Sequence, residues 1–139
     1  MFEKCLYFNS NALARSVTRV WTEAYKKFNL SPPHAFLVRV VLSSPGILPC
    51  ELADKLSLSR STVTRFLDSL EKKGFIRRDA LGNDGREIQV FPTSQAKEIH
   101  AELNKTRALL IDKMDSLFGE KELSETIGNL RSIRDKLEK

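Results

Sequence analysis

Residues 51–65, ELADKLSLSRSTVTR, and residues 70–78, LEKKGFIRR, decide the fold. The first stretch predicts a short helix over about residues 49–56 and then a tight break before Ser59, a residue type that caps helix N-termini. A second, longer helix runs from there to the lysine pair that precedes Gly74, which is the usual arrangement at a helix C-terminus. A short helix, a tight turn and a longer helix predict a helix-turn-helix.

The apolar residues of these two helices are spaced so that they can pack against each other. Ala53 is the smallest of them, and a small side chain is needed where two helices cross steeply after a short turn. The packing set comprises Leu52, Ala53 and Leu56 on the first helix and Val63, Phe66, Leu67 and Leu70 on the second. This packing leaves the opposite face of the longer helix to solvent or to a partner.

A β-hairpin is predicted directly after the helix pair. Residues 75–79 and residues 86–91 alternate between apolar and polar types, as strands with one buried face do. Between them, residues 81–85 read LGNDG, a composition typical of tight turns. Helix, turn, helix and hairpin in this order predict a winged helix-turn-helix.

Amphipathic helices are predicted on both sides of this part. Apolar residues at three- and four-residue steps indicate a helix over about residues 5–28. Ser31 then caps a helix in which Phe36, Leu37, Val40 and Val41 are expected to face inward. After the hairpin, a helix begins at Thr93 and breaks at Gly119, and a final helix follows.

The final helix gives the clearest indication of a partner chain. Its apolar residues Leu123, Ile127, Leu130, Ile133 and Leu137 form a continuous seam at helical spacing. A helix-turn-helix and a hairpin need only one neighbouring helix to complete their core, whereas this chain supplies three more. We therefore expect a homodimer, and the alternative is a purely intramolecular bundle.

The exposed face of the longer helix carries hydroxyls and arginines near its N-terminus. Arginine binds guanine through two hydrogen bonds, and hydroxyls reach bases or phosphates. The positive end of the helix dipole also attracts phosphate. The net charge of +5 suits a polyanionic partner. The alternative is an ordinary solvated helix face. The residues of this face are Arg60, Ser61, Thr62, Thr64, Arg65 and Asp68.

The helix pair and the hairpin together resemble the MarR (multiple antibiotic resistance regulator) family. The resemblance rests on residues 51–65 and 70–78 and on the sequence DGR at residues 84–86, which matches that family's Asp-x-Arg wing motif. It extends over nearly the whole chain. It implies a mainly α (α+β) fold, a winged helix-turn-helix with N- and C-terminal dimerisation helices. The implied organisation is a single domain over 1–139, with a DNA-binding part at 30–92 and dimerisation helices at 1–29 and 93–139.

The resemblance also implies a function. The expected protein is a transcriptional regulator, a repressor, that binds a pseudo-palindromic DNA operator as a homodimer and is released by a small-molecule effector or another signal. Carried over residue by residue, the recognition-helix contacts are Arg60, Ser61, Thr62, Thr64 and Arg65, and Arg86 is the wing arginine. Ser59, Arg77 and Arg78 complete the expected DNA contacts.

The sequence also bears on three other classes of function. No glycine-rich phosphate loop and no recognisable catalytic arrangement occurs, so neither an enzyme nor a cofactor is expected. A winged-helix module that binds only protein tends to replace the groove-facing arginines, which this chain keeps. An architectural protein indifferent to sequence would show no operator preference at constant salt.

Cys5 and the two histidines are the candidates for a sensor site. Cys5 lies beside Tyr7 and Phe8 on the first helix, where peroxide-sensing MarR relatives carry a reactive cysteine, and the alternative is a structural cysteine. His34 and His100 are the two histidines, which are too few for a metal-ligand set, so no metal is expected.

The start of the chain and its cysteines indicate the cellular compartment of the protein. The first residues, MFEKC, do not read as a signal peptide, because an acidic residue stands third and no long apolar core follows. The apolar run at residues 36–38 is broken by Arg39, so no membrane span is expected. Two cysteines outside any Cys-x-x-Cys pair favour a reducing, cytoplasmic setting.

Overall fold

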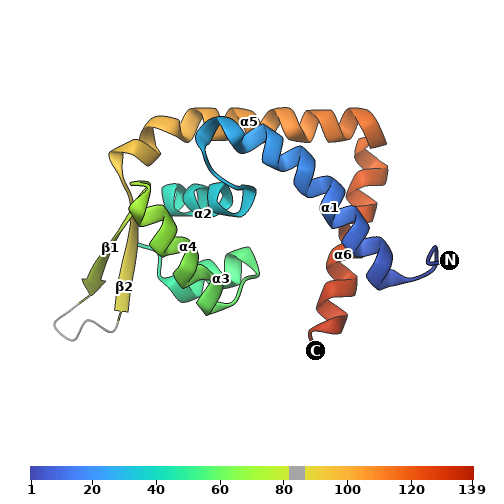
Figure 1. Cartoon of the computed structure of the whole chain (residues 1–139), viewed down its shortest axis with the longest axis horizontal. Coiled ribbons are helices and arrows are strands. Elements are labelled where there is room, and N and C mark those ends of the chain that lie inside the picture. Colours follow the sequence, from blue (N-terminus) through green and yellow to red (C-terminus); the bar gives the residue numbers. More distant parts are fainter. Residues whose placement is uncertain (82–86) are drawn as a thin grey trace. The chain divides into compact units, whose positions relative to one another are not determined.

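The computed structural model of the chain describes residues 1–81 and 87–139 (Figure 1). Helices dominate it, and the described strands form one two-stranded antiparallel sheet. The predicted mainly α (α+β) winged fold is therefore confirmed. In order, the elements are α1 (Leu6–Tyr25), the 3-10 turn η1 (Lys26–Phe28), α2 (Pro32–Ser43), α3 (Pro49–Leu56), α4 (Arg60–Lys72), β1 (Ile76–Leu81), β2 (Glu87–Pro92), α5 (Ser94–Phe118) and α6 (Glu120–Leu137).

The chain divides into two compact units, residues 1–103 and residues 104–139. The first contains α1 to β2 and the beginning of α5, and the second contains the rest of α5 and α6. Within the first unit, the hairpin lies beside α4 (Figure 1). Helix α3 packs against α4, and β2 contacts both α2 and α3. The expected single domain over 1–139 stays a prediction.

Three predicted helix caps are confirmed. Ser31, Ser59 and Thr93 each accept a hydrogen bond from the backbone N–H three residues later, at 3.4, 3.2 and 3.2 Å. Each bond satisfies one of the backbone donors that a helix N-terminus leaves without an intrahelical partner. Local sequence therefore defines where α2, α4 and α5 begin.

The start of α3 is held in a different way. Leu48 occupies the cap position and has no side chain that accepts a hydrogen bond. Instead, Glu51 Oε1 accepts a hydrogen bond from the Leu48 backbone N–H at 3.0 Å, which is one half of a capping box. The Glu51 carboxylate therefore holds the chain where it enters α3.

The core of the first unit joins the helix pair, α2 and the hairpin. Of the predicted packing set, Leu56 and Phe66 are half-buried and the other five residues are buried. The buried hydrophobic residues of this part are Ala35, Leu37, Val38, Val41, Ile47, Leu52, Ala53, Val63, Leu67, Leu70, Phe75, Ile76 and Val90.

The predicted inward face of α2 is partly wrong. Leu37 and Val41 are buried and Val40 is half-buried, but Phe36 is 40% exposed. The buried residues of α2 are Ala35, Leu37, Val38 and Val41, and at about 100° per residue position 36 lies nearly opposite the middle of that stripe. The ring of Phe36 instead meets the edge of the Tyr25 ring, with centroids 6.2 Å apart.

The hairpin is fixed at its base. The register pairs Ile76 with Pro92 at one end and Leu81 with Glu87 at the other. The segment between α2 and α3 adds a bridge on the far edge of β2, because the Val90 N–H donates to the Ile47 carbonyl at 2.9 Å. One end of the hairpin is therefore attached to the helical core.

The first and last helices, α1 and α6, are called the terminal helices, and they bury far less of their apolar surface. Tyr25 is the one buried residue of α1, and α6 has none. Along α1, Leu6, Leu13 and Val17 are all more than 40% exposed. Within the described part of the chain, no helix is both long enough and apolar enough to cross a membrane.

Candidate nucleic-acid interface

The N-terminal end of α4 presents a cluster of hydroxyls. Ser59 Oγ lies 3.1 Å from Ser61 Oγ and donates to Thr62 Oγ1 at 2.9 Å. Arg65 Nη2 donates to the same Thr62 oxygen at 3.3 Å, so that its guanidinium lies along the helix surface. Thr62 is half-buried, and the other three residues are exposed. Four of the predicted contacts therefore form one connected polar surface at the start of this helix.

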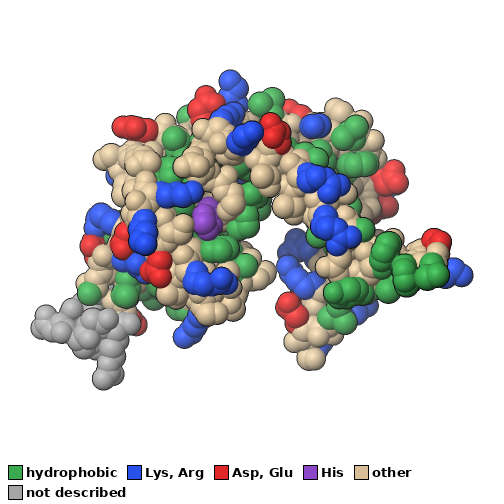
Figure 2. All heavy atoms as spheres, viewed as in Figure 1, with side chains coloured by type: hydrophobic (Ala, Val, Ile, Leu, Met, Phe, Trp, Pro, Cys, Tyr) green, Lys and Arg blue, Asp and Glu red, His purple; other side chains and the backbone are tan. Residues whose placement is uncertain are grey.

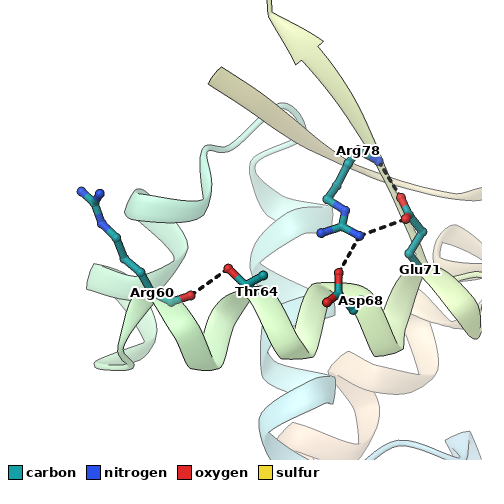
Figure 3. A network of polar contacts seen from close by, with 5 residues as sticks. All are labelled: Arg60, Thr64, Asp68, Glu71 and Arg78. Atoms are coloured by element: carbon teal, nitrogen blue, oxygen red, sulfur yellow. Dashed lines mark hydrogen bonds and ion pairs between the residues drawn. The ribbon is translucent and has the colours of Figure 1, made fainter. Parts of the chain in front are cut away.

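Arg60 and Thr64 extend the same surface. The Thr64 hydroxyl donates to the Arg60 backbone carbonyl one helical turn earlier, at 3.0 Å, and both residues are exposed (Figure 3). The guanidinium of Arg60 points away from the helix (Figure 3). At an α-helix N-terminus, an extended arginine and a partial positive charge both attract phosphate.

The two strand arginines have other environments. Arg77 forms an ion pair with Asp79, and its guanidinium lies 4.5 Å from the centre of the Phe91 ring, its cross-strand neighbour. Its side chain is 55% exposed. Successive residues of a strand point to opposite faces. Arg78 therefore faces the other way from Arg77.

Arg78 is held by two carboxylates of α4 (Figure 3). Its Nη2 donates to Asp68 Oδ1 at 2.8 Å and to Glu71 Oε1 at 3.0 Å. The hydrogen bond from Arg78 lowers the pKa of Glu71, and the same bond raises the pKa of Arg78. The structure thus separates Arg78 from the arginines of the α4 surface.

The remaining predicted contact, Arg86, lies outside the described residues, as do Asp84 and Gly85 of the wing motif. Asp68 lies on the predicted outer face of α4, but its pairing with Arg78 was not predicted. The signal that was available is the spacing of Asp68 and Glu71, which places two carboxylates on one side of a helix just before the two arginines of β1.

Cys5 is not part of this polar surface. Cys5 is exposed and stands at the N-cap position of α1, where its backbone N–H donates to the Phe2 carbonyl at 3.0 Å. Among residues 1–81 and 87–139, no three metal-binding side chains come together.

His34 belongs to the packing beneath α4. Its ring meets Phe66 edge-on, with centroids 4.6 Å apart. Burial, reinforced by the nearby Lys73 ammonium, lowers the pKa of His34 below its usual value. The imidazole therefore belongs to the packing between α2 and α4.

Comparison with known proteins finds a family model that matches this part of the chain. Residues 30–88 match the model of the MarR family. The HTH-type transcriptional regulator SarZ of Staphylococcus aureus (strain USA300) is 24% identical over 133 residues, which cover 96% of this chain and 88% of SarZ. The prediction that the chain is not an enzyme is confirmed, because the family and this relative are transcriptional regulators.

Solved structures show the same fold at low sequence identity. The S. aureus MepR–DNA complex superposes with a TM-score of 0.83 at 15% identity, over 97% of this chain and 99% of MepR. The M. tuberculosis transcriptional regulator MosR in complex with DNA gives a TM-score of 0.81 at 19% identity, over 96% of this chain and 98% of MosR. Both of these similar structures contain DNA.

Proposed function

This chain belongs to the MarR family of helix-turn-helix transcriptional regulators, and we propose that it binds a pseudo-palindromic DNA operator as a homodimer and represses transcription until a small ligand or another signal releases it. The observation that carries the proposal is the N-terminal surface of α4, where two arginines and four hydroxyl side chains lie together. A helix that enters the major groove contacts base edges with such residues at its N-terminal end.

Different residues of this surface contact the bases and the phosphates. Arg65 and Thr64 lie about one turn into α4, where a recognition helix meets base edges. Arg60 and Ser59 stand at the helix start, where the helix dipole favours phosphate. Arg86 of the wing motif, which lies outside the described residues, is the proposed minor-groove contact.

Dimerisation follows from the exposed apolar residues of the terminal helices. Ile127, Leu130 and Ile133 recur on one face of α6 and are 47, 45 and 38% exposed. A second copy of the chain covers this seam and places two α4 helices on one duplex. Two such helices bind half-sites about 10 base pairs apart. The operator is then a pseudo-palindrome.

The test is selection of bound fragments from genomic DNA with three proteins at one salt concentration. They are the wild type, the double variant Arg60→Ala/Arg65→Ala, and the control Lys97→Ala/Lys105→Ala, which removes the same charge from α5. We expect the wild type and the control to enrich one shared palindromic sequence and the α4 variant to enrich none. Enrichment of no common sequence by the wild type, or of the same sequence by the α4 variant, contradicts the proposal.

Release is tested on the operator recovered in this way. Small phenolic acids, peroxides and zinc are added to the wild-type complex, and the fraction of DNA bound is measured. Release by one of them identifies the class of signal. If peroxide is the signal, the variant Cys5→Ser must stay bound, since Cys5 is the exposed cysteine of the chain.

A further inference from the structure

We propose that Arg78 is a positioning residue, which fixes the direction of the β1–β2 hairpin relative to α4 and makes no contact with DNA itself. The inference deepens the proposed function and rests on it, since the hairpin is the wing of the DNA-binding part. It replaces the expectation from sequence that Arg78 binds DNA directly. We call Arg78, Asp68 and Glu71 together the wing clamp (Figure 3).

The wing clamp joins strand and helix at three points. The Arg78 guanidinium donates to Asp68 at 2.8 Å and to Glu71 at 3.0 Å. The Arg78 backbone N–H donates to the second oxygen of Glu71 at 3.3 Å. Glu71 thus binds both the side chain and the main chain of one strand residue, which restrains the strand in direction as well as in distance.

Burial separates Arg78 from the other arginines of this part of the chain. The Arg78 side chain is 23% exposed, whereas that of Arg77, on the opposite face of the same strand, is 55% exposed. An arginine that contacts a phosphate needs its guanidinium at the surface and unshared. The guanidinium of Arg78 is instead turned back toward α4.

The charge of the wing clamp also opposes a direct contact with DNA. One guanidinium and two carboxylates carry a net charge of −1. A group of that sign repels phosphate, and a DNA-binding protein gains affinity from each negative charge that it loses. Any benefit of these carboxylates to DNA binding must therefore come from the geometry that they impose.

The covalent link between α4 and β1 makes such a restraint useful. The helix ends in a Schellman motif, in which Gly74 takes a φ of +85° and the Phe75 N–H donates to the Leu70 carbonyl at 2.9 Å. From Ile76 to Leu81 the strand extends about 17 Å. A change of about 10° in strand direction at this junction moves the far end of β1 by about 3 Å, which is enough to break a hydrogen bond.

The first test asks whether Glu71→Gln raises or lowers the affinity for the operator. Glu71→Gln removes a negative charge, so simple electrostatics predicts tighter DNA binding. The wing clamp predicts the opposite, a loss of operator affinity of about threefold to tenfold, because an amide replaces the carboxylate that holds Arg78. Asp54→Asn, which removes a carboxylate of α3 outside the clamp, is the matched control and should bind as tightly as wild type or tighter. Equal or tighter binding by Glu71→Gln overturns the proposal.

The second test exchanges the charges. Arg78→Glu alone should bind the operator weakly, and Arg78→Glu with Glu71→Arg should recover most of the lost affinity, because the pair forms again with its charges reversed. Arg78→Glu with Asp54→Arg, which makes the same change of charge outside the clamp, is the matched control. If Arg78 touched phosphate, the two double variants would bind the operator equally well. That result overturns the proposal. Urea unfolding without DNA shows for each variant that the chain is folded.

A third measurement does not use DNA and therefore separates this inference from the proposed function. Hydrogen exchange of the β1 amides, in the protein alone, should be faster in Glu71→Gln than in wild type and unchanged in Asp54→Asn. If the wild type binds no operator but β1 exchanges faster in Glu71→Gln, the clamp exists and the proposed function fails. Unchanged exchange at β1 overturns the clamp whether or not DNA binds.

Discussion

The helix-turn-helix part and the terminal helices place their apolar residues in opposite ways. From α2 to β2, leucines, valines and isoleucines fill a common core, and Leu37, Leu52 and Val63 are fully buried. In α6 no residue is buried, and α1 buries Tyr25 alone. Figure 2 shows hydrophobic side chains gathered at the N-terminal end of α1. The first region satisfies its hydrophobic surface within one chain, and the second leaves it for another surface to cover.

Under the proposed function, this difference lets one short chain bind both DNA and a second copy of itself. A core that is complete within one chain holds α4 rigid, so the groups at its exposed end are presented in a fixed arrangement. Apolar helix faces left uncovered supply binding energy to a second copy in proportion to their area. Substitutions in the two regions should therefore fail in different ways.

The largest effect is expected on α6. Ile127→Glu with Leu130→Glu puts two carboxylates into the proposed seam, and each lost apolar contact is worth about 1.5–3 kcal/mol. The dimer should weaken about hundredfold or more, so that the variant sediments as a monomer at micromolar concentration. Glu125→Lys, on the same helix, is the control and should remain dimeric. A wild-type protein that is folded and monomeric at that concentration would refute the comparison.

A core substitution in the winged part should show the opposite dependence. Leu67 is 1% exposed, so Leu67→Ala leaves a cavity and should cost about 2–5 kcal/mol of the free energy of unfolding. The loss should be similar at low and high protein concentration, because the core lies within one chain. Urea unfolding at two concentrations measures it. A loss that disappears at high concentration would mean that this core also depends on the partner.

Changes on the exposed end of α4 should alter DNA binding without altering the dimer. We expect Arg65→Ala and Thr64→Ala to weaken operator binding by about 1–3 kcal/mol and to affect random DNA less. Arg60→Ala should weaken binding to both, because a phosphate contact carries no sequence information. Competition binding at fixed salt separates the two patterns. An equal loss on operator and random DNA for all three variants would argue against base recognition by α4.

The smallest effect concerns pH. The Arg78 guanidinium lowers the pKa of Glu71 in the folded chain. A carboxyl with a lowered folded pKa stabilises the protein at pH values above its unfolded pKa, and this stability is lost as the pH falls through the folded value. The urea midpoint of wild type should therefore exceed that of Glu71→Gln at pH 6, and the difference should shrink as the pH falls below 4.5, the ordinary value for this carboxyl. A difference that stays constant over this range would show that the ion pair adds nothing.

The features predicted correctly from sequence are those that neighbouring residues determine. The caps at Ser31, Ser59 and Thr93 and the helix end at Gly74 each depend on a few adjacent positions. Phe36 was misplaced because a run of apolar residues in α2 fits more than one inward stripe, and only the packed neighbours select between them. The partners of Arg78 were missed, because the spacing of Asp68 and Glu71 shows two carboxylates on one side of α4 but not which strand arginine they meet, which depends on the direction that β1 takes after Gly74.

The most direct measurement is the number of chains bound to one operator duplex. Sedimentation velocity of the wild-type protein with a labelled duplex that carries a single copy of the selected sequence gives that number. We expect two chains per duplex, with Arg60→Ala/Arg65→Ala sedimenting as a dimer apart from the DNA. One chain per duplex, with no two-chain species as protein is added, would contradict the division into a DNA-binding part and dimerisation helices.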